Sequence, residues 1–101
     1  MTQLPFAQIP PVRPPENEPA EHRLKRLRMR SMRRGIKEMD IILVRYADAR
    51  LAGMDGPMLD TYEVLLEEND QDLYQWVSGQ LPAPERLRLM IADIKATACT
   101  P

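Results

Sequence analysis

After about residue 20, apolar residues recur three and four positions apart along the chain, with polar residues between them. This spacing places the apolar side chains on one face of an α-helix. The segments that show it are about 21–32, 36–51, 57–68, 70–78 and 84–97. Ile41, Ile42 and Val44 leave little of the middle turn of the second segment polar, which is typical of the central helix of a bundle. The pattern predicts an all-α fold, a compact five-helix bundle.

The same spacing predicts which side chains form the core. In the third helix, Met58 and Tyr62 are expected to point inward, whereas Glu63 falls outside that face. In the fourth helix, Leu73 and Trp76 are expected in the core. Glycine, proline and asparagine residues separate the segments, as expected for short turns between helices.

The first twenty residues have a different composition. Six of the ten prolines of the chain fall in the first nineteen positions, and proline cannot donate to a helix or a central strand. We therefore expect residues 1–20 to be a disordered Pro-rich tail and residues 21–97 to form the helical bundle domain. The tail carries only one arginine, unlike a mitochondrial transit peptide, and no apolar run is long enough to cross a membrane. The expected location is the cytoplasm.

Charged residues are segregated along the chain, although the formal net charge is only -1. From His22 to Lys37 there are eight basic residues and no acidic one, and from Leu51 to Glu85 there are eight acidic residues and no Lys or Arg. Such asymmetry usually concerns partners more than the fold. Two interpretations of the basic helix 22–37 stay open: a solvated amphipathic helix whose long arginine stems cover apolar surface, or a contact surface for an acidic protein or for nucleic acid.

A protein partner is favoured over nucleic acid on composition. The isoelectric point is near 5.8, below the values typical of nucleic-acid-binding domains. No aromatic residue that would stack on bases lies between Phe6 and Tyr46. A small helical nucleic-acid-binding or regulatory module that uses helix 22–37 stays as the alternative.

Catalytic and metal-binding groups are sparse. The single His22 stands beside the tail and the single Cys99 stands almost at the C-terminus, so neither is expected to act as a metal ligand or nucleophile. No Gly-rich phosphate loop is present. The acidic pairs Glu67-Glu68 and Asp70–Asp72 are expected on a solvated helix face. The sequence predicts a protein that is not an enzyme, with no catalytic residue and no metal site.

The junction between the first two helices stands out on physical grounds. Gly35, at the start of an apolar helix, leaves backbone N–H groups unshielded, and the helix dipole adds positive potential there. Glu38 suits the first turn of that helix and is placed to pair with Arg34, four residues earlier. One interpretation of this pattern is a capped turn. The other is a preorganised docking patch, which the enrichment of arginine among interface hot spots supports.

Two motifs in this region resemble a known family. The run Arg34-Gly35-Ile36-Lys37-Glu38 resembles the Arg-Gly-x-x-Glu signature of the succinate dehydrogenase flavinylation (FAD assembly) factors. Further on, the segment 65–76 is similar to that family's Leu-Leu-Glu…Asp-x-Asp-Leu…Trp segment. The resemblance covers about residues 23–80, with both motifs in order and at compatible spacing. The Arg-rich approach to the signature looks like that of bacterial members.

The resemblance implies an assembly factor that binds the flavoprotein subunit of succinate dehydrogenase and promotes covalent attachment of FAD to that subunit's own histidine. FAD is then the partner's cofactor, and none is expected to be bound stably by this chain. The implied partner-binding residues are Arg30, Arg33, Arg34, Gly35, Glu38 and Asp40. Fumarate reductase as a further client stays open, no nucleic-acid or membrane partner is implied, and a monomer is the simplest expectation.

Overall fold

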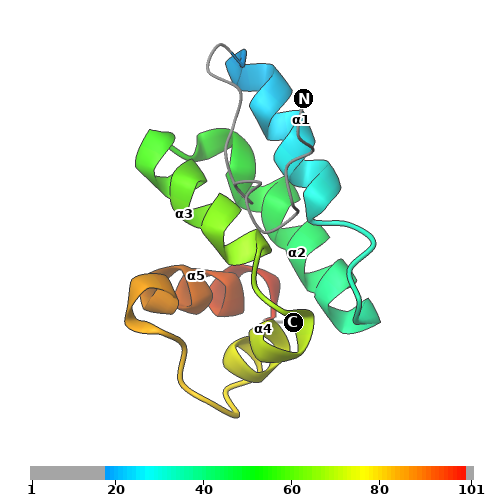
Figure 1. The fold of residues 1–101 in the computed structure, drawn as a ribbon, viewed down its shortest axis with the longest axis vertical. Helices are drawn as coiled ribbons and strands as arrows, with labels where there is room; N and C mark the ends of the chain where they lie inside the picture. The colour runs from blue at the N-terminus through cyan, green and yellow to red at the C-terminus, as the bar shows by residue number, and fades with distance from the viewer. Residues whose placement is uncertain (1–17, 100–101) are drawn as a thin grey trace, which may run out of the picture.

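The computed structural model describes residues 18–99, which fold into five α-helices with two short 3-10 turns between them (Figure 1). The elements are α1 (Ala20–Arg30), α2 (Lys37–Arg50), η2 (Leu51–Gly53), α3 (Gly56–Leu66), α4 (Asp70–Val77), η3 (Glu85–Leu87) and α5 (Arg88–Ala98). The all-α prediction is confirmed, and each predicted helix is present within a few residues of its expected ends. Residues 1–17 of the predicted tail lie outside the described residues.

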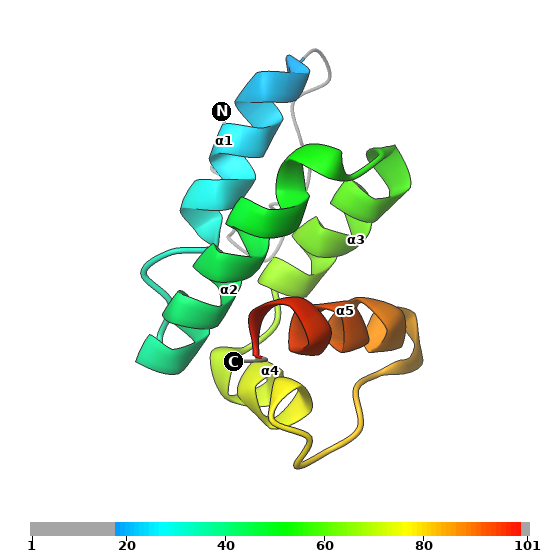
Figure 2. The ribbon, with the colours of Figure 1, turned by 180° about the vertical axis from the view of Figure 1, so that it is seen from behind.

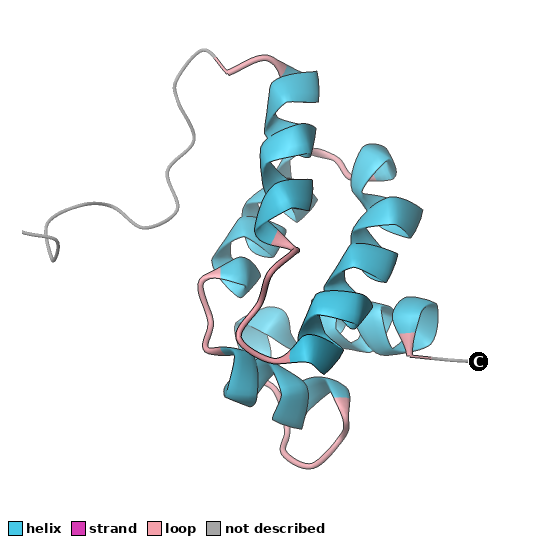
Figure 3. Ribbon diagram, turned by 90° about the vertical axis from the view of Figure 1, so that its right-hand side faces the viewer, coloured by secondary structure: helices cyan, strands magenta, loops and turns pink. Residues whose placement is uncertain are grey.

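The helices form two groups. Helices α1, α2 and α3 lie side by side along the long direction of the molecule, whereas α5 crosses their lower end and α4 packs beneath it (Figures 1 and 2). Helix α2 contacts α1, η2, α4 and α5, so it is the central helix, as predicted. Short loops join the helices, and the described part contains no strand (Figure 3).

The helix ends follow from local chemistry. The Asp55 side chain accepts a hydrogen bond from the Met58 amide at the start of α3, and Asn69 does the same for the Gln71 amide at the start of α4. Pro57 occupies the first turn of α3, where its missing N–H removes no helical bond. Each of these caps satisfies donors that the helix itself leaves free.

Three residues are more exposed than the apolar pattern of the sequence predicts. Ile41 of the central helix is 48% exposed and Met58 of α3 is 40% exposed. Trp76 is only partly buried, at the edge of the core. Met58 and Trp76 lie at the border of the buried face of their helices, where a sequence pattern does not show how far the neighbouring helix reaches. Ile41 lies on the side of α2 opposite the buried Met39 and Leu43.

Two tyrosines fill the centre of the bundle. The rings of Tyr46 and Tyr62 pack with centroids 5.7 Å apart, and both residues are fully buried. The Tyr46 hydroxyl donates to Asp93 Oδ2 at 2.7 Å, and the Tyr62 hydroxyl lies 2.7 Å from Ser31 Oγ. Both buried hydroxyls therefore have a hydrogen-bond partner, as buried polar groups in proteins usually do.

These tyrosines make the fold sensitive to alkali. Burial raises the pKa of Tyr62 to about 12 from its ordinary value of 10. A phenol whose pKa is raised on folding stabilises the fold fully below pH 10, and that contribution is lost as the pH rises toward 12. We expect the free energy of unfolding to fall across this range, by on the order of 2 kcal/mol for Tyr62. Urea titrations of the wild type and of Tyr62→Phe check it, since the variant should lose less stability on alkalinisation; equal losses would contradict it.

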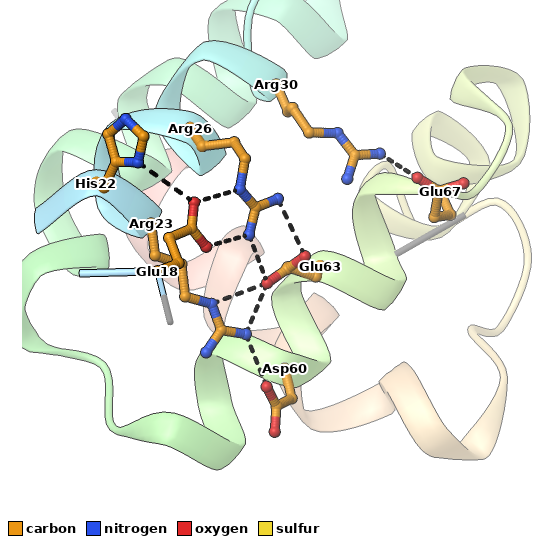
Figure 4. A network of polar contacts seen from close by, with 8 residues as sticks. All are labelled: Glu18, His22, Arg23, Arg26, Arg30, Asp60, Glu63 and Glu67. Carbon is orange, nitrogen blue, oxygen red and sulfur yellow. Dashed lines mark hydrogen bonds and ion pairs between the residues drawn. The ribbon is translucent and has the colours of Figure 1, made fainter. Parts of the chain in front are cut away.

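The segregated charges pair with each other inside the molecule. Arginines of α1 point toward carboxylates of α3 (Figure 4). Arg23 binds Asp60 and Glu63, Arg26 binds Glu63, and Arg30 binds Glu67. The prediction that charge segregation concerns partners more than the fold is therefore wrong for these arginines, because the two segments of opposite charge fold against each other.

Glu63 is the centre of this network and is 1% exposed. It accepts hydrogen bonds from Arg23 Nε at 2.8 Å and from both terminal nitrogens of Arg26 at 3.2 Å. Hydrogen bonds to Glu18 and Glu63 in turn raise the pKa of the Arg26 guanidinium above its usual value. The sequence pattern places Glu63 outside the apolar face of its helix, and the structure shows that it is nevertheless buried; a buried carboxylate is stable only where cations or donors surround it.

Candidate protein-docking site

The chain between α1 and α2 forms a tight turn. The Ser31 amide donates to the Leu27 carbonyl at 3.0 Å, and Arg33 adopts a left-handed backbone conformation with a φ of 54°. A positive φ is unfavourable for a residue with a side chain, so the turn holds Arg33 in place through its neighbours. Gly35 has no positive φ, so its role in the turn is not the conformational freedom of glycine.

Arg34 anchors the turn to the body of the protein. Its Nε donates to Asp70 Oδ1 at 2.8 Å, and its terminal nitrogens donate to the carbonyls of Arg30 at 2.9 Å and Leu66 at 3.1 Å. The side chain is 10% exposed. A guanidinium satisfies carbonyls at the ends of α1 and α3, where helices leave acceptors free. The predicted pair between Arg34 and Glu38 is wrong: Arg34 lies before the start of α2, so helical i,i+4 spacing does not apply to it.

The backbone of Gly35 binds the carboxylate of Asp70 as well. Its amide donates to Asp70 Oδ2 at 2.6 Å. A Cβ at this position would lie 3.1 Å from that oxygen, which is tighter than ordinary contact. Asp70 thus binds the side chain of Arg34 and the backbone of Gly35 at once. We call these three residues the turn clamp.

Asp70 is the residue that the site prediction missed. It was expected on a solvated face, yet its side chain is 18% exposed and engaged by the turn. The sequence does carry one signal for it, because Asp70 lies inside the second motif of the family resemblance. The two motifs meet in space through Arg34 and Asp70, which are 36 positions apart in the sequence.

The remaining predicted site residues divide by exposure. Arg33, Gly35 and Glu38 are exposed, in the turn and in the first turn of α2. Neither Arg33 nor Glu38 forms an ion pair with any residue between 18 and 99, and Ile36 provides no side-chain cap for α2. Arg30 is held by Glu67 of α3, and Asp40 is half-buried on α2. The expectation of unshielded backbone N–H groups at Gly35 is wrong for its own amide, which Asp70 binds. The structure places at one edge an exposed glycine, together with a cation and a carboxylate that have no ion-pair partner among residues 18–99.

Groups suited to catalysis are not gathered elsewhere in the described part. Among residues 18–99, no three His, Cys, Asp or Glu side chains come together as a metal site requires. His22 is exposed and lies 3.9 Å from Glu18 (Figure 4). Burial raises the pKa of the Cys99 thiol, which disfavours the reactive thiolate. No helix in this part is long and apolar enough to span a membrane.

The chain is similar to known proteins over most of its length. A family model described as "Flavinator of succinate dehydrogenase" matches residues 25–98. Succinate dehydrogenase assembly factor 2, mitochondrial, from Candida glabrata is 40% identical over 69% of this chain and 48% of its own length. The protein of that name from Yarrowia lipolytica is 38% identical over 78% of this chain and 56% of its own. Succinate dehydrogenase assembly factor 2-A, mitochondrial, from Drosophila yakuba is 35% identical over 91% of this chain and 59% of its own.

This chain spans about half the length of the curated relatives that it matches. The matched residues run from within α1 to the end of α5, so they include the turn clamp and all the helices that hold it. On this match the chain belongs to the family of flavinators of succinate dehydrogenase.

Proposed function

We propose that this chain is an assembly factor that binds the flavoprotein subunit of succinate dehydrogenase and promotes covalent attachment of FAD to it. The proposal rests on the family match and on one structural observation. The turn clamp fixes Arg33, Gly35 and Glu38 at an exposed edge, with their charged groups engaged by no residue of the described part. These three residues are the contact surface that we propose.

A rigid edge suits this role because it loses little entropy on binding. If the factor binds one arrangement of the flavoprotein more tightly than the others, the population of that arrangement rises. If that arrangement aligns the flavin with the residue that receives it, attachment accelerates through orientation alone. The factor then supplies no nucleophile, base or metal, and it holds no cofactor of its own.

The direct test is an attachment assay. The apo flavoprotein subunit is incubated with FAD, with and without this protein, and then denatured; covalent flavin is measured by its fluorescence on the subunit. We expect faster attachment in the presence of the factor. A flavoprotein variant that lacks the FAD-bearing histidine is the control, since its denatured chain should retain no fluorescence. An unchanged rate together with no complex between the two proteins would contradict the proposal.

The nucleic-acid alternative loses much of its support. Among the eight basic residues of segment 22–37, Arg23, Arg26, Arg28, Arg30 and Arg34 are held by carboxylates. Cations that are already paired release few counterions on binding a phosphate backbone. We therefore propose no nucleic-acid partner for this helix.

Finer points of the role are also proposals. The flavoprotein subunit of fumarate reductase is a second client to test in the same assay, and a monomer is the working form that we propose. The relatives are named as mitochondrial proteins. Those names concern the relatives, and the cytoplasmic location of this chain stays a prediction.

A further inference from the structure

A shallow groove runs from the turn along the outer face of α2. Met32 and Arg33 line it from the turn, and Asp40, Ile41 and Val44 line it from the helix. Its volume is about 450 Å³, enough for one or two side chains of a bound polypeptide. The groove adjoins the proposed contact surface, because Arg33 belongs to both.

The charged groups around the groove differ in what they bind. Asp48 is held by Arg28 at 2.7 Å, and Arg45 donates to the Ala98 carbonyl at 3.3 Å. Arg33 and Asp40, by contrast, form no ion pair within residues 18–99. The groove therefore offers one cation and one carboxylate that pair with no charged group of the described part of the chain.

Asp40 carries the strongest sign of a missing partner. Its Oδ1 is buried, yet it accepts no hydrogen bond from any residue in the described part of the chain. Carboxylate oxygens removed from water are nearly always hydrogen-bonded, because losing hydration without a replacement is unfavourable. A donor brought by another molecule satisfies this oxygen once the half-buried Asp40 side chain, which lines the groove, rotates to present it.

Three apolar side chains line the groove between these charged groups. Ile41 is 48% exposed, Met32 is 36% exposed, and Val44 is partly buried. Grouped apolar side chains that stay in water mark interaction surfaces more often than isolated ones do.

We propose that this groove receives a segment of the flavoprotein subunit that carries an apolar side chain beside a hydrogen-bond donor. The apolar side chain lies over Ile41 and Val44. The donor, an N–H of the backbone or of a basic side chain, reaches Asp40 Oδ1 and fixes the register of the segment. This inference rests on the proposed function: the exposed edge at Gly35 makes the first contact, and the groove selects which segment of the partner lies beside it.

Two variants test the groove, with the dissociation constant for the apo flavoprotein subunit and the melting temperature of the free factor as readouts. Asp40→Ala should weaken binding about ten-fold while the free protein melts at the same or a higher temperature, because an unsatisfied buried carboxylate is gone. Asp40→Asn keeps an acceptor oxygen and should lose less than about three-fold. Ile41→Ser should weaken binding about ten-fold, since it removes apolar area from an exposed position.

Leu89→Ser is the matched control, because Leu89 is 73% exposed on α5 and lines neither the groove nor the turn. It should change binding less than two-fold. If Asp40→Ala lowers the melting temperature and the affinity together, Asp40 is a structural residue and the inference is wrong. If Asp40→Ala and Ile41→Ser bind like the wild type while Gly35→Arg does not, the groove is excluded and the proposed function stands. If the wild type itself binds no flavoprotein, both proposals fail.

Discussion

Gly35→Arg should abolish flavoprotein binding and FAD attachment while leaving the helical content of the free protein unchanged. The Gly35 amide is bound to Asp70, and a Cβ there would lie 3.1 Å from the carboxylate oxygen. A long side chain must therefore leave toward solvent, across the edge that we propose as the contact surface. Blocking the centre of an interface removes about 2–4 kcal/mol, so we expect the affinity to fall by about 30- to 1,000-fold.

Two glycine variants make this prediction specific. Gly35→Ala should show a small loss, because the Asp70 side chain can move by a few tenths of an ångström to accept a Cβ. Gly53→Arg is the matched control: a Cβ at Gly53, in η2, meets nothing within 4 Å. Circular dichroism of each free protein and titration against the apo flavoprotein measure the two effects separately. Equal affinity for Gly35→Arg and Gly53→Arg would exclude the turn as the docking site.

Glu63→Ala should cause the largest loss of stability among the charged residues. Its removal leaves the guanidiniums of Arg23 and Arg26 close to each other without the carboxylate that they share. Both arginines keep some access to water, at 17% and 29% exposure, which lowers the penalty below that of a fully buried pair. We expect a loss of about 2–3 kcal/mol, which corresponds to a fall in melting temperature of roughly 10–15 °C for a domain of this size.

The matched control for Glu63 is Asp48. It pairs with Arg28 across α1 and α2, with both side chains about half exposed. Exposed ion pairs contribute little, so Asp48→Ala should change the free energy of unfolding by less than about 1 kcal/mol. Urea denaturation followed by circular dichroism compares the two variants. Similar midpoints would show that burial of Glu63 adds nothing to its ion pairs.

The sequence predicts the helices well because a helix is a local structure. Three signals depend only on neighbours within one helical turn: the 3.6-residue spacing, the proline at the start of α3 and the cap at Asn69. Each can therefore be identified from a short stretch of sequence. The contacts between helices are not local. Glu63 pairs with residues 37 and 40 positions away, and a helix examined alone shows only a charged residue off its apolar face.

The candidate site shows the same limit. The turn and its exposed glycine follow from local sequence, and the family resemblance points to the same segment. What Arg34 binds does not follow, because the partner Asp70 is brought near by the packing of α4. The buried, unpaired oxygen of Asp40 is likewise a property of the assembled surface, and its residue type alone carries no sign of it.

The ion pairs between the arginines of α1 and the carboxylates of α3 affect the rate at which a partner associates. Opposite charges held a few ångströms apart produce a field that decays quickly with distance, and the chain's net charge of -1 adds little to it. A partner approaching this surface is then not drawn in over long range. Association should proceed at the rate of an unsteered encounter, about 10⁵–10⁶ M⁻¹ s⁻¹, and should change little with ionic strength. In the complex that we propose, short-range contacts at the turn then set the dissociation rate, and with it the time for which the partner is held.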